Sequence, residues 1–172
     1  MATDDAGYFL LPSFLWQGRR SALDDLEAWL NRELWWVTEG APGRDRLVAG
    51  ARVCFHVSKP RTGAAGKGAG VVAKARVKSA ASFPLGEATQ AGLPTQLSYG
   101  TPYGIALDEI VWLPNGVRIT RGVCATLDAY QGKPLSGHWR WLCQPFIREL
   151  TARDYAILTG GTRVGIPTQR PR

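Results

Sequence analysis

The sequence predicts a single α+β domain, and three observations support this prediction. Strand-like runs are gathered in the middle of the chain, whereas helical patterns stand near its two ends, without the regular strand–helix alternation of α/β proteins. With 172 residues and 45% hydrophobic content, the chain suits one core. An open sheet of this size would leave unprotected edges, so we expect the strands to curl into a small barrel-like sheet flanked by helices. The domain should occupy residues 1–160, and a basic, flexible tail should follow at residues 161–172.

The first part of the chain predicts two strands with a helix between them. Residues 7–11 form a buried strand that Pro12 ends. Ser21 and Asp24 have the spacing of a capping box, which begins a helix. The apolar stripe of this helix consists of Leu23, Leu26 and Leu30, with Trp29 beside it. Residues 34–38 form the second strand.

Two further strands are predicted in the middle of the chain, at residues 52–57 and 71–78. The first alternates between an apolar face and a mixed face, which holds Cys54 and His56. The second alternates as well, and its apolar face consists of Val71, Ala73, Ala75 and Val77. A glycine-rich, cationic loop at residues 59–70 joins the two strands and should be mobile.

The second half contains a long stretch without periodicity, residues 80–103, of the kind that is often functional. Residues 104–113 then predict a strand, and Asn115-Gly116 is a strong hairpin signal into residues 117–120. A short helix is expected around residues 123–130. The last helix begins at its N-cap Thr151, with Asp154 three positions on, and ends at Gly160-Gly161.

Trp35 and Trp36 are the most informative pair in the chain. Adjacent strand residues point to opposite faces of a sheet, so one indole can enter the core while the other lines a surface or pocket. A presented indole in a chain of net charge +7 suits a flat, anionic ligand. Nucleic-acid bases fit that description.

The positive charge is concentrated in the later part of the chain. Residues 1–45 hold eight acids and four arginines, a net charge of −4, whereas the remaining residues hold six acids and 17 bases, a net charge of +11. Such a distribution favours a polyanionic partner. The alternative is a compositional bias, because 16 of the 21 basic residues are arginine, which GC-rich coding produces without selection for binding.

Several protein classes are excluded or disfavoured by what the sequence lacks. No apolar run approaches the ~20 residues of a membrane span, and the acidic N-terminus has no signal-peptide pattern, so we expect a cytoplasmic protein with no membrane contact. Three widely spaced cysteines, Cys54, Cys124 and Cys143, should be buried and reduced. Neither His56 nor His138 has partners at metal-ligand spacing. We expect a monomer without metal or small-molecule cofactor.

Four stretches of the chain resemble the EVE domain family of the PUA-like superfamily, to which YTH and ASCH domains also belong. Residues 8–13 (YFLLPS) are similar to its opening strand, with Pro12 where many relatives have lysine, and residues 36–38 (WVT) resemble the Trp-x-Ser/Thr segment of the YTH base cage. Residues 49–57 with 69–77 are similar to its central strand pair, and residues 146–158 to its closing element. The resemblance implies a PUA-like fold over residues 7–160.

The resemblance also implies a reader of modified bases, without chemistry on the base. EVE domains are similar to domains that bind 5-methylcytosine or related 5-modified cytosines in DNA, so methylated DNA is the expected partner. The nucleotide would be extruded into an aromatic pocket. An RNA-binding module that reads a base such as N6-methyladenosine remains open, as does a small nucleic-acid-processing enzyme. Against the enzyme, no catalytic motif is present, and the acidic pair Asp108-Glu109 should point to opposite faces of its strand.

The resemblance and the strand pattern together name the candidate site residues. Trp36 would form one wall of the pocket, with Trp35 in the core. The second wall would come from Tyr103 or Tyr99, Phe83 and Trp112 being further candidates for which core packing is the alternative. The remaining pocket candidates are Pro12, Ser13 and His56. Phosphate contacts would come from the loop residues Lys59, Arg61 and Lys67 and from one face of the following strand, Lys74, Arg76 and Lys78.

Overall fold

The structure, a computed structural model, describes residues 6–13, 22–57, 70–83, 101–132 and 147–160. These residues form one six-stranded sheet in the order β2-β5-β4-β3-β1-β6. The strands are β1 (Tyr8–Ser13), β2 (Leu34–Thr38), β3 (Arg52–Val57), β4 (Gly70–Ser82), β5 (Pro102–Val117) and β6 (Arg148–Leu150). No helix among the described residues is long and apolar enough to cross a membrane.

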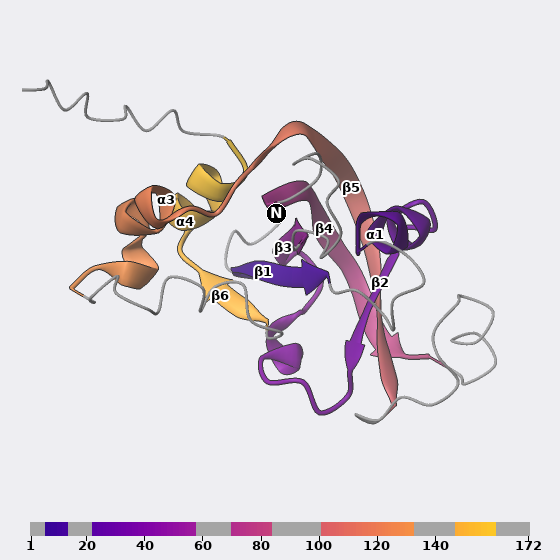
Figure 1. Cartoon of the computed structure of the whole chain (residues 1–172). Coiled ribbons are helices and arrows are strands. Elements are labelled where there is room, and N and C mark those ends of the chain that lie inside the picture. Colours follow the sequence, from indigo (N-terminus) through magenta and orange to yellow (C-terminus); the bar gives the residue numbers. More distant parts are fainter. Residues whose placement is uncertain (1–5, 14–21, 58–69, 84–100, 133–146, 161–172) are drawn as a thin grey trace, which may run out of the picture.

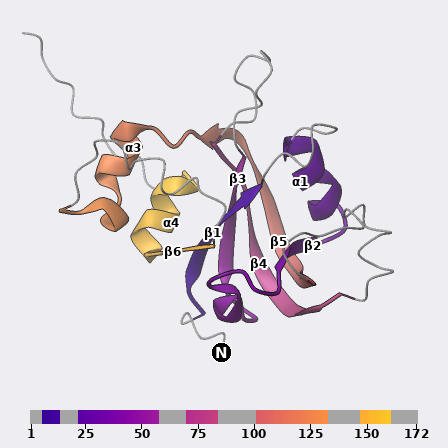
Figure 2. The same cartoon turned by 60° about the horizontal axis from the view of Figure 1, so that its bottom comes forward.

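Helices lie on both sides of this sheet (Figures 1 and 2). Helix α1 lies beside β2 and β5, whereas α3 and α4 lie together on the opposite side of the molecule. The helical elements are α1 (Ala22–Leu30), the 3₁₀ turn η1 (Arg44–Arg46), α3 (Arg121–Thr126), the 3₁₀ turn η2 (Asp128–Tyr130) and α4 (Ala152–Leu158). The predicted helix near residues 123–130 is therefore present as α3 followed by η2.

The sheet is mixed, which confirms the predicted α+β class. Strands β1 and β3 run parallel, while the other four pairs are antiparallel. The sheet is curved but does not close, because β2 and β6 are its edges in the described part of the chain. The prediction of a curved sheet is thus confirmed, and its shape is that of an open barrel.

Two hydrophobic clusters hold the helices against the sheet. β1 and β3 contribute to both, because alternate strand residues point to opposite faces. The first cluster includes Phe9, Leu11, Val53 and Phe55 from these strands and Leu26, Trp29 and Leu30 from α1. The second includes Leu10 and Cys54 together with Cys124, Leu127, Leu150, Tyr155 and Leu158. The predicted apolar stripe of α1 is therefore confirmed.

A register shift in β4 corrects one predicted face. Val71 was expected beside Ala73 on one face, but it belongs to the second cluster, whereas Val72 and Ala73 belong to the first. Between two successive pairs of the β3–β4 ladder, β3 advances one residue, from Phe55 to His56, whereas β4 moves two residues, from Ala73 to Val71. A one-residue slip moves side chains to the other face of a sheet.

The hairpin predicted at Asn115-Gly116 is wrong. β5 continues to Val117, and its pairing with β4 jumps from Trp112 to Val117 while β4 advances only from Ala73 to Val71. The extra β5 residues form an excursion within the strand, in which Gly116 adopts a left-handed φ of 48°. The turn signal therefore marks a bulge instead of a chain reversal.

The prediction that Asp108 and Glu109 point to opposite faces is also wrong. Glu109 has a left-handed φ of 49°, and the β4–β5 register shifts at this point. Both carboxylates reach Arg76: Asp108 accepts two hydrogen bonds of 2.9 Å, and a Glu109 oxygen lies 3.3 Å from the guanidinium. An inserted bulge residue breaks the alternation on which the prediction depended.

The two ends of the chain show one further correction and one confirmation. β1 continues through Pro12, which a strand tolerates at an edge, and beyond Leu10 its only partner in the described sheet is β3. Short β6 was not predicted. Thr151 caps α4 as expected, since its hydroxyl accepts from the Asp154 backbone N–H at 3.0 Å, and Gly160 follows with a φ of 75°.

Asp154 links α4 to η2 and should be important for stability. Its fully buried carboxylate accepts from the backbone N–H groups of Asp128 and Ala129 at 2.6 and 3.1 Å. Asp154→Ala should lower the free energy of unfolding by about 2–3 kcal/mol, because both donors lose a charged acceptor. Urea unfolding measures this. The control variant Arg153→Ala, at an exposed neighbouring position, should lower the free energy of unfolding by less than about 1 kcal/mol. Equal losses in the two variants would contradict the stabilising role of Asp154.

Candidate functional site

Trp35 and Trp36 occupy different environments, as their alternation on β2 requires. Trp35 is 5% exposed and meets the Phe55 ring edge-on, with ring centroids 5.3 Å apart. Its cross-strand partner is the fully buried Ile105. Trp36 instead pairs with Gly104 and is partly exposed. The Trp36 side chain is thus only partly buried, although its indole Nε1 atom is shielded from solvent.

Small residues lie beside Trp36 across the sheet. Trp36 on β2 is opposite Gly104 on β5, and Gly104 is opposite Ala81 on β4. These three residues share one face, and Phe83, two residues after Ala81, lies on that face as well. Its ring lies directly on Gly104: a Cβ atom there would be 2.1 Å from Phe83 Cε1. Gly104 is therefore the position that makes room for the Phe83 ring.

Trp29 of α1 contacts both partly exposed rings. Its ring centroid lies 6.4 Å from that of Trp36, at an interplanar angle of 50°, and 6.3 Å from that of Phe83, at 24°. Trp29 itself is only 2% exposed. We call Trp29, Trp36 and Phe83 the aromatic cluster. In this cluster two partly exposed aromatic rings contact a buried one, an arrangement that suits the stacking of a planar ligand.

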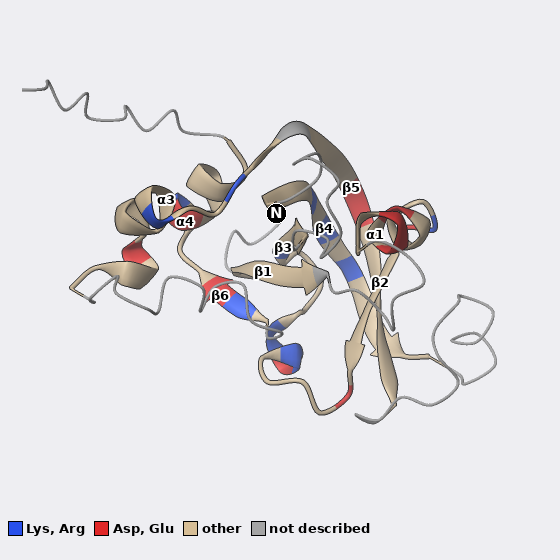
Figure 3. Cartoon of the chain, in the orientation of Figure 1, with Lys and Arg blue, Asp and Glu red and all other residues tan. Residues whose placement is uncertain are grey.

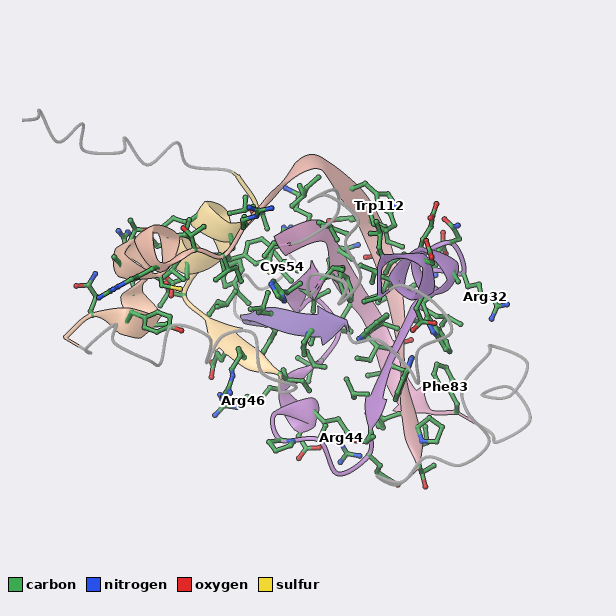
Figure 4. All side chains as sticks on the ribbon, in the orientation of Figure 1. Arg32, Arg44, Arg46, Cys54, Phe83 and Trp112 are labelled. Carbon is green, nitrogen blue, oxygen red and sulfur yellow. The ribbon has the colours of Figure 1, made fainter. Side chains whose placement is uncertain are left out.

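The position of this cluster can be followed along β5. Figure 4 shows Phe83 near the end of β5 that pairs with β2, and Trp112 toward the opposite end. Trp112 is 38% exposed and is opposite Ala73 on β4. Of the two further aromatic candidates, Phe83 therefore belongs to the neighbourhood of Trp36 and Trp112 does not. The Gly104–Phe83 contact itself has no signal in the sequence.

The structure does not bring Tyr103 onto the face of Trp36. Tyr103 is opposite Val37, so the β2–β5 register places it on the face of Trp35. The guanidinium of Arg44 lies over its ring, 4.7 Å from the centroid, in cation–π geometry. Tyr99 lies outside the described residues. The second wall expected from Tyr103 is thus not formed on this face.

Pro12, Ser13 and His56 lie together on the β1–β3 pair. Pro12 is opposite His56 and Ser13 opposite Val57; the side chain of Ser13 lies outside the described part of the structure. His56 is 6% exposed, and its burial lowers the pKa of the imidazole to about 4. His56 is therefore uncharged at neutral pH. It follows Cys54, whose buried thiol has a raised pKa, on the face of the second cluster.

The predicted phosphate contacts are only partly available. Lys59, Arg61 and Lys67 lie outside the described residues. Arg76 is engaged by Asp108 and Glu109, and this hydrogen bonding raises the pKa of Arg76 and lowers that of Asp108. Lys74 is half-buried and Lys78 is exposed. Lys78 is thus the most accessible cation of the three strand residues.

The charge around the aromatic cluster is uneven. Figure 3 shows acidic residues on α1 and basic residues on β4. The acids in the first turn of α1 are Asp24 and Asp25, one to two turns before Trp29. An anionic ligand would therefore be attracted more strongly to the side of β4 than to the side of α1. In the described part of the chain, no group of three or more His, Cys, Asp or Glu residues is arranged to hold a metal ion.

Comparison with known proteins supports the fold. The sequence matches no protein-family profile and no curated protein. The solved structure of PSPTO5229 from Pseudomonas syringae is similar with a TM-score of 0.51 and 12% identity, over 89% of this chain and 97% of that one. Human THYN1 in complex with DNA containing 5-methylcytosine is similar with a TM-score of 0.45 and 14% identity, over 90% and 96%. The first of these two likenesses shows that the two chains share a fold.

Burial of His56 predicts a pH dependence of folding. The imidazole ordinarily titrates near 6.5 but near 4 in the folded protein, so the unfolded chain binds a proton between these values that the folded protein does not. Folding stability is then lost as the pH falls through this window. The free energy of unfolding should decrease by about 2 kcal/mol between pH 7 and pH 5 because of this residue.

Urea unfolding at both pH values, for the wild type and for His56→Gln, isolates this effect. The variant should show a pH dependence smaller by about 2 kcal/mol. An equal decrease in both proteins would mean that His56 is not kept neutral by burial.

Proposed function

We propose that this protein binds nucleic acid and reads a modified base in DNA, of the 5-methylcytosine type, by stacking the extruded base on Trp36. The observation that supports this proposal is the position of the Trp36 ring. It is partly exposed, rests on buried Trp29, and has the small residues Gly104 and Ala81 beside it. It also stands in the segment that resembles the aromatic wall of a base-binding family.

The free energies of stacking and of base extrusion determine how such a site would work. Stacking of one base on an aromatic side chain contributes ~1–3 kcal/mol, whereas extrusion of the base costs a few kcal/mol. The two nearly cancel, so phosphate contacts must supply much of the affinity. One buried methyl group adds only about 0.8 kcal/mol. The protein therefore discriminates only moderately between methylated and unmethylated bases, and stacking requires no catalytic group.

Loss of the Trp36 ring should remove the contribution of stacking to the binding free energy. Trp36→Ala should weaken binding to a duplex with one 5-methylcytosine about 5- to 100-fold, while Trp36→Phe should retain part of the affinity. Fluorescence anisotropy with a labelled oligonucleotide measures this, with melting curves to verify folding. The matched control is Trp112→Ala, an exposed tryptophan at the other end of β5. Equal effects of Trp36→Ala and Trp112→Ala would oppose the proposal.

A panel of ligands tests the identity of the base. Methylated and unmethylated duplexes of one sequence should differ by less than about tenfold, since a single methyl group is buried. RNA of the same sequence, with and without N6-methyladenosine, is the alternative ligand class. Tighter binding to the RNA would replace the DNA proposal with an RNA reader. Cleavage of labelled DNA in the presence of Mg²⁺ would replace it with an enzyme.

Lys78 should contribute to the phosphate term. Lys78→Ala should weaken binding to all DNA sequences alike and reduce the slope of log K against log salt concentration by about 1. Affinities between 50 and 200 mM salt give this slope. Arg153→Ala is the control, because Arg153 pairs with Asp128 on the side of α3 and α4. An unchanged slope for Lys78→Ala would place the DNA backbone elsewhere.

A further inference from the structure

We infer that Phe83 forms the second aromatic wall of the site and that Gly104 sets its position. The inference rests on the proposed function, because it assigns a role within the same base-stacking site. It replaces Tyr103, whose strand position places it on the other face of the sheet. A planar base would be held between the π faces of Trp36 and Phe83, with Trp29 behind both rings.

Phe83 lies on the same face of the sheet as Trp36. Phe83 directly follows β4, and its backbone N–H donates to the Pro102 carbonyl at 3.3 Å, which continues the β4–β5 ladder by one residue. Ladder continuation places the Phe83 side chain on the face of Ala81, Gly104 and Trp36. The Phe83 ring thus lies over Gly104, which is directly opposite Trp36 on the neighbouring strand.

The Phe83 ring is held by Trp29 and by the backbone at Gly104. Phe83 is nearly parallel to Trp29, at 24°, so its inner side is packed against a ring that is only 2% exposed. Gly104 lets the ring descend onto the backbone, because any Cβ atom there would overlap it at 2.1 Å. A ring held at two contacts loses little further freedom when a ligand stacks on it, which favours binding.

The exposure of Phe83 differs from that of a phenylalanine that only fills the core. A core phenylalanine in this fold is represented by Phe9 and Phe55, which are 2% and 0% exposed. Phe83 instead remains partly exposed, as Trp36 does. The two residues therefore have the same combination of a packed side and an accessible side.

The test compares Phe83→Leu, Phe83→Tyr and Gly104→Ala with the wild type and with Trp36→Ala, in binding to the duplex with one 5-methylcytosine. Phe83→Leu keeps apolar bulk but removes the π face, and it should weaken binding about 5- to 100-fold. Phe83→Tyr should bind within about threefold of the wild type. Gly104→Ala should weaken binding as Phe83→Leu does, because its Cβ atom displaces the ring. Melting curves verify that each variant is folded.

The outcomes separate this inference from the proposed function. If Trp36→Ala loses affinity while Phe83→Leu and Gly104→Ala bind like the wild type, the second wall is elsewhere and the base-reading proposal stands. Tighter binding by Phe83→Leu would show that the ring occupies the place of the base, which overturns the inference as well. If the wild type binds no methylated duplex above the unmethylated background and Trp36→Ala changes nothing, both fail together.

Discussion

The structure depends on the pairing of β4 with β5. These are the two longest strands, 13 and 16 residues, and their ladder contains three register shifts. Each shift inserts residues on one strand, which bends the pair and increases its twist. The curved sheet of six strands packs α1 against one hydrophobic cluster and α3 and α4 against the other. The same ladder places Ala81, Gly104 and Phe83 next to Trp36.

Two regions of the sheet differ in how far their side chains are buried. The face toward α3 and α4 is closed by a second cluster and by the buried carboxylate of Asp154, which fastens η2 to α4. The other end of the sheet, where β2 pairs with β5, carries the partly exposed rings of Trp36 and Phe83 on buried Trp29. A buried hydrophobic cluster thus lies toward α3 and α4, and partly exposed aromatic rings lie where β2 pairs with β5. Under the proposed function, the packed scaffold would hold these rings in place before a base binds.

Sequence reasoning was successful where the signal is local. The stripe of Leu26 and Leu30 and the cap at Thr151 are set by residues within a few positions of one another, and both are confirmed. Bulges are set by how two strands pair, so the faces of Val71 and Glu109 could not be read from alternation alone.

The same limit applies to the candidate site. The segment of Trp36 could be identified from its residue types and from its resemblance to a base-cage segment. The contact between Phe83 and Gly104, in contrast, joins residues 21 positions apart, and it depends on a strand register that no local pattern encodes. Of the other candidates, Pro12 and His56 are neighbours on the β1–β3 pair, as strand register alone dictates. The roles assigned to them remain predictions.

The bulge at Glu109 lowers the positive charge that the sheet surface offers to a polyanion. By turning a second carboxylate toward Arg76, it supplies the sheet surface with internal counterions for Arg76 and Arg52. Under the proposed function, an incoming phosphate would compete with these carboxylates, so the surface would attract any duplex less strongly than the chain's total charge suggests. Non-specific binding would thereby be weakened, and a larger share of the preference would depend on the base held between the rings.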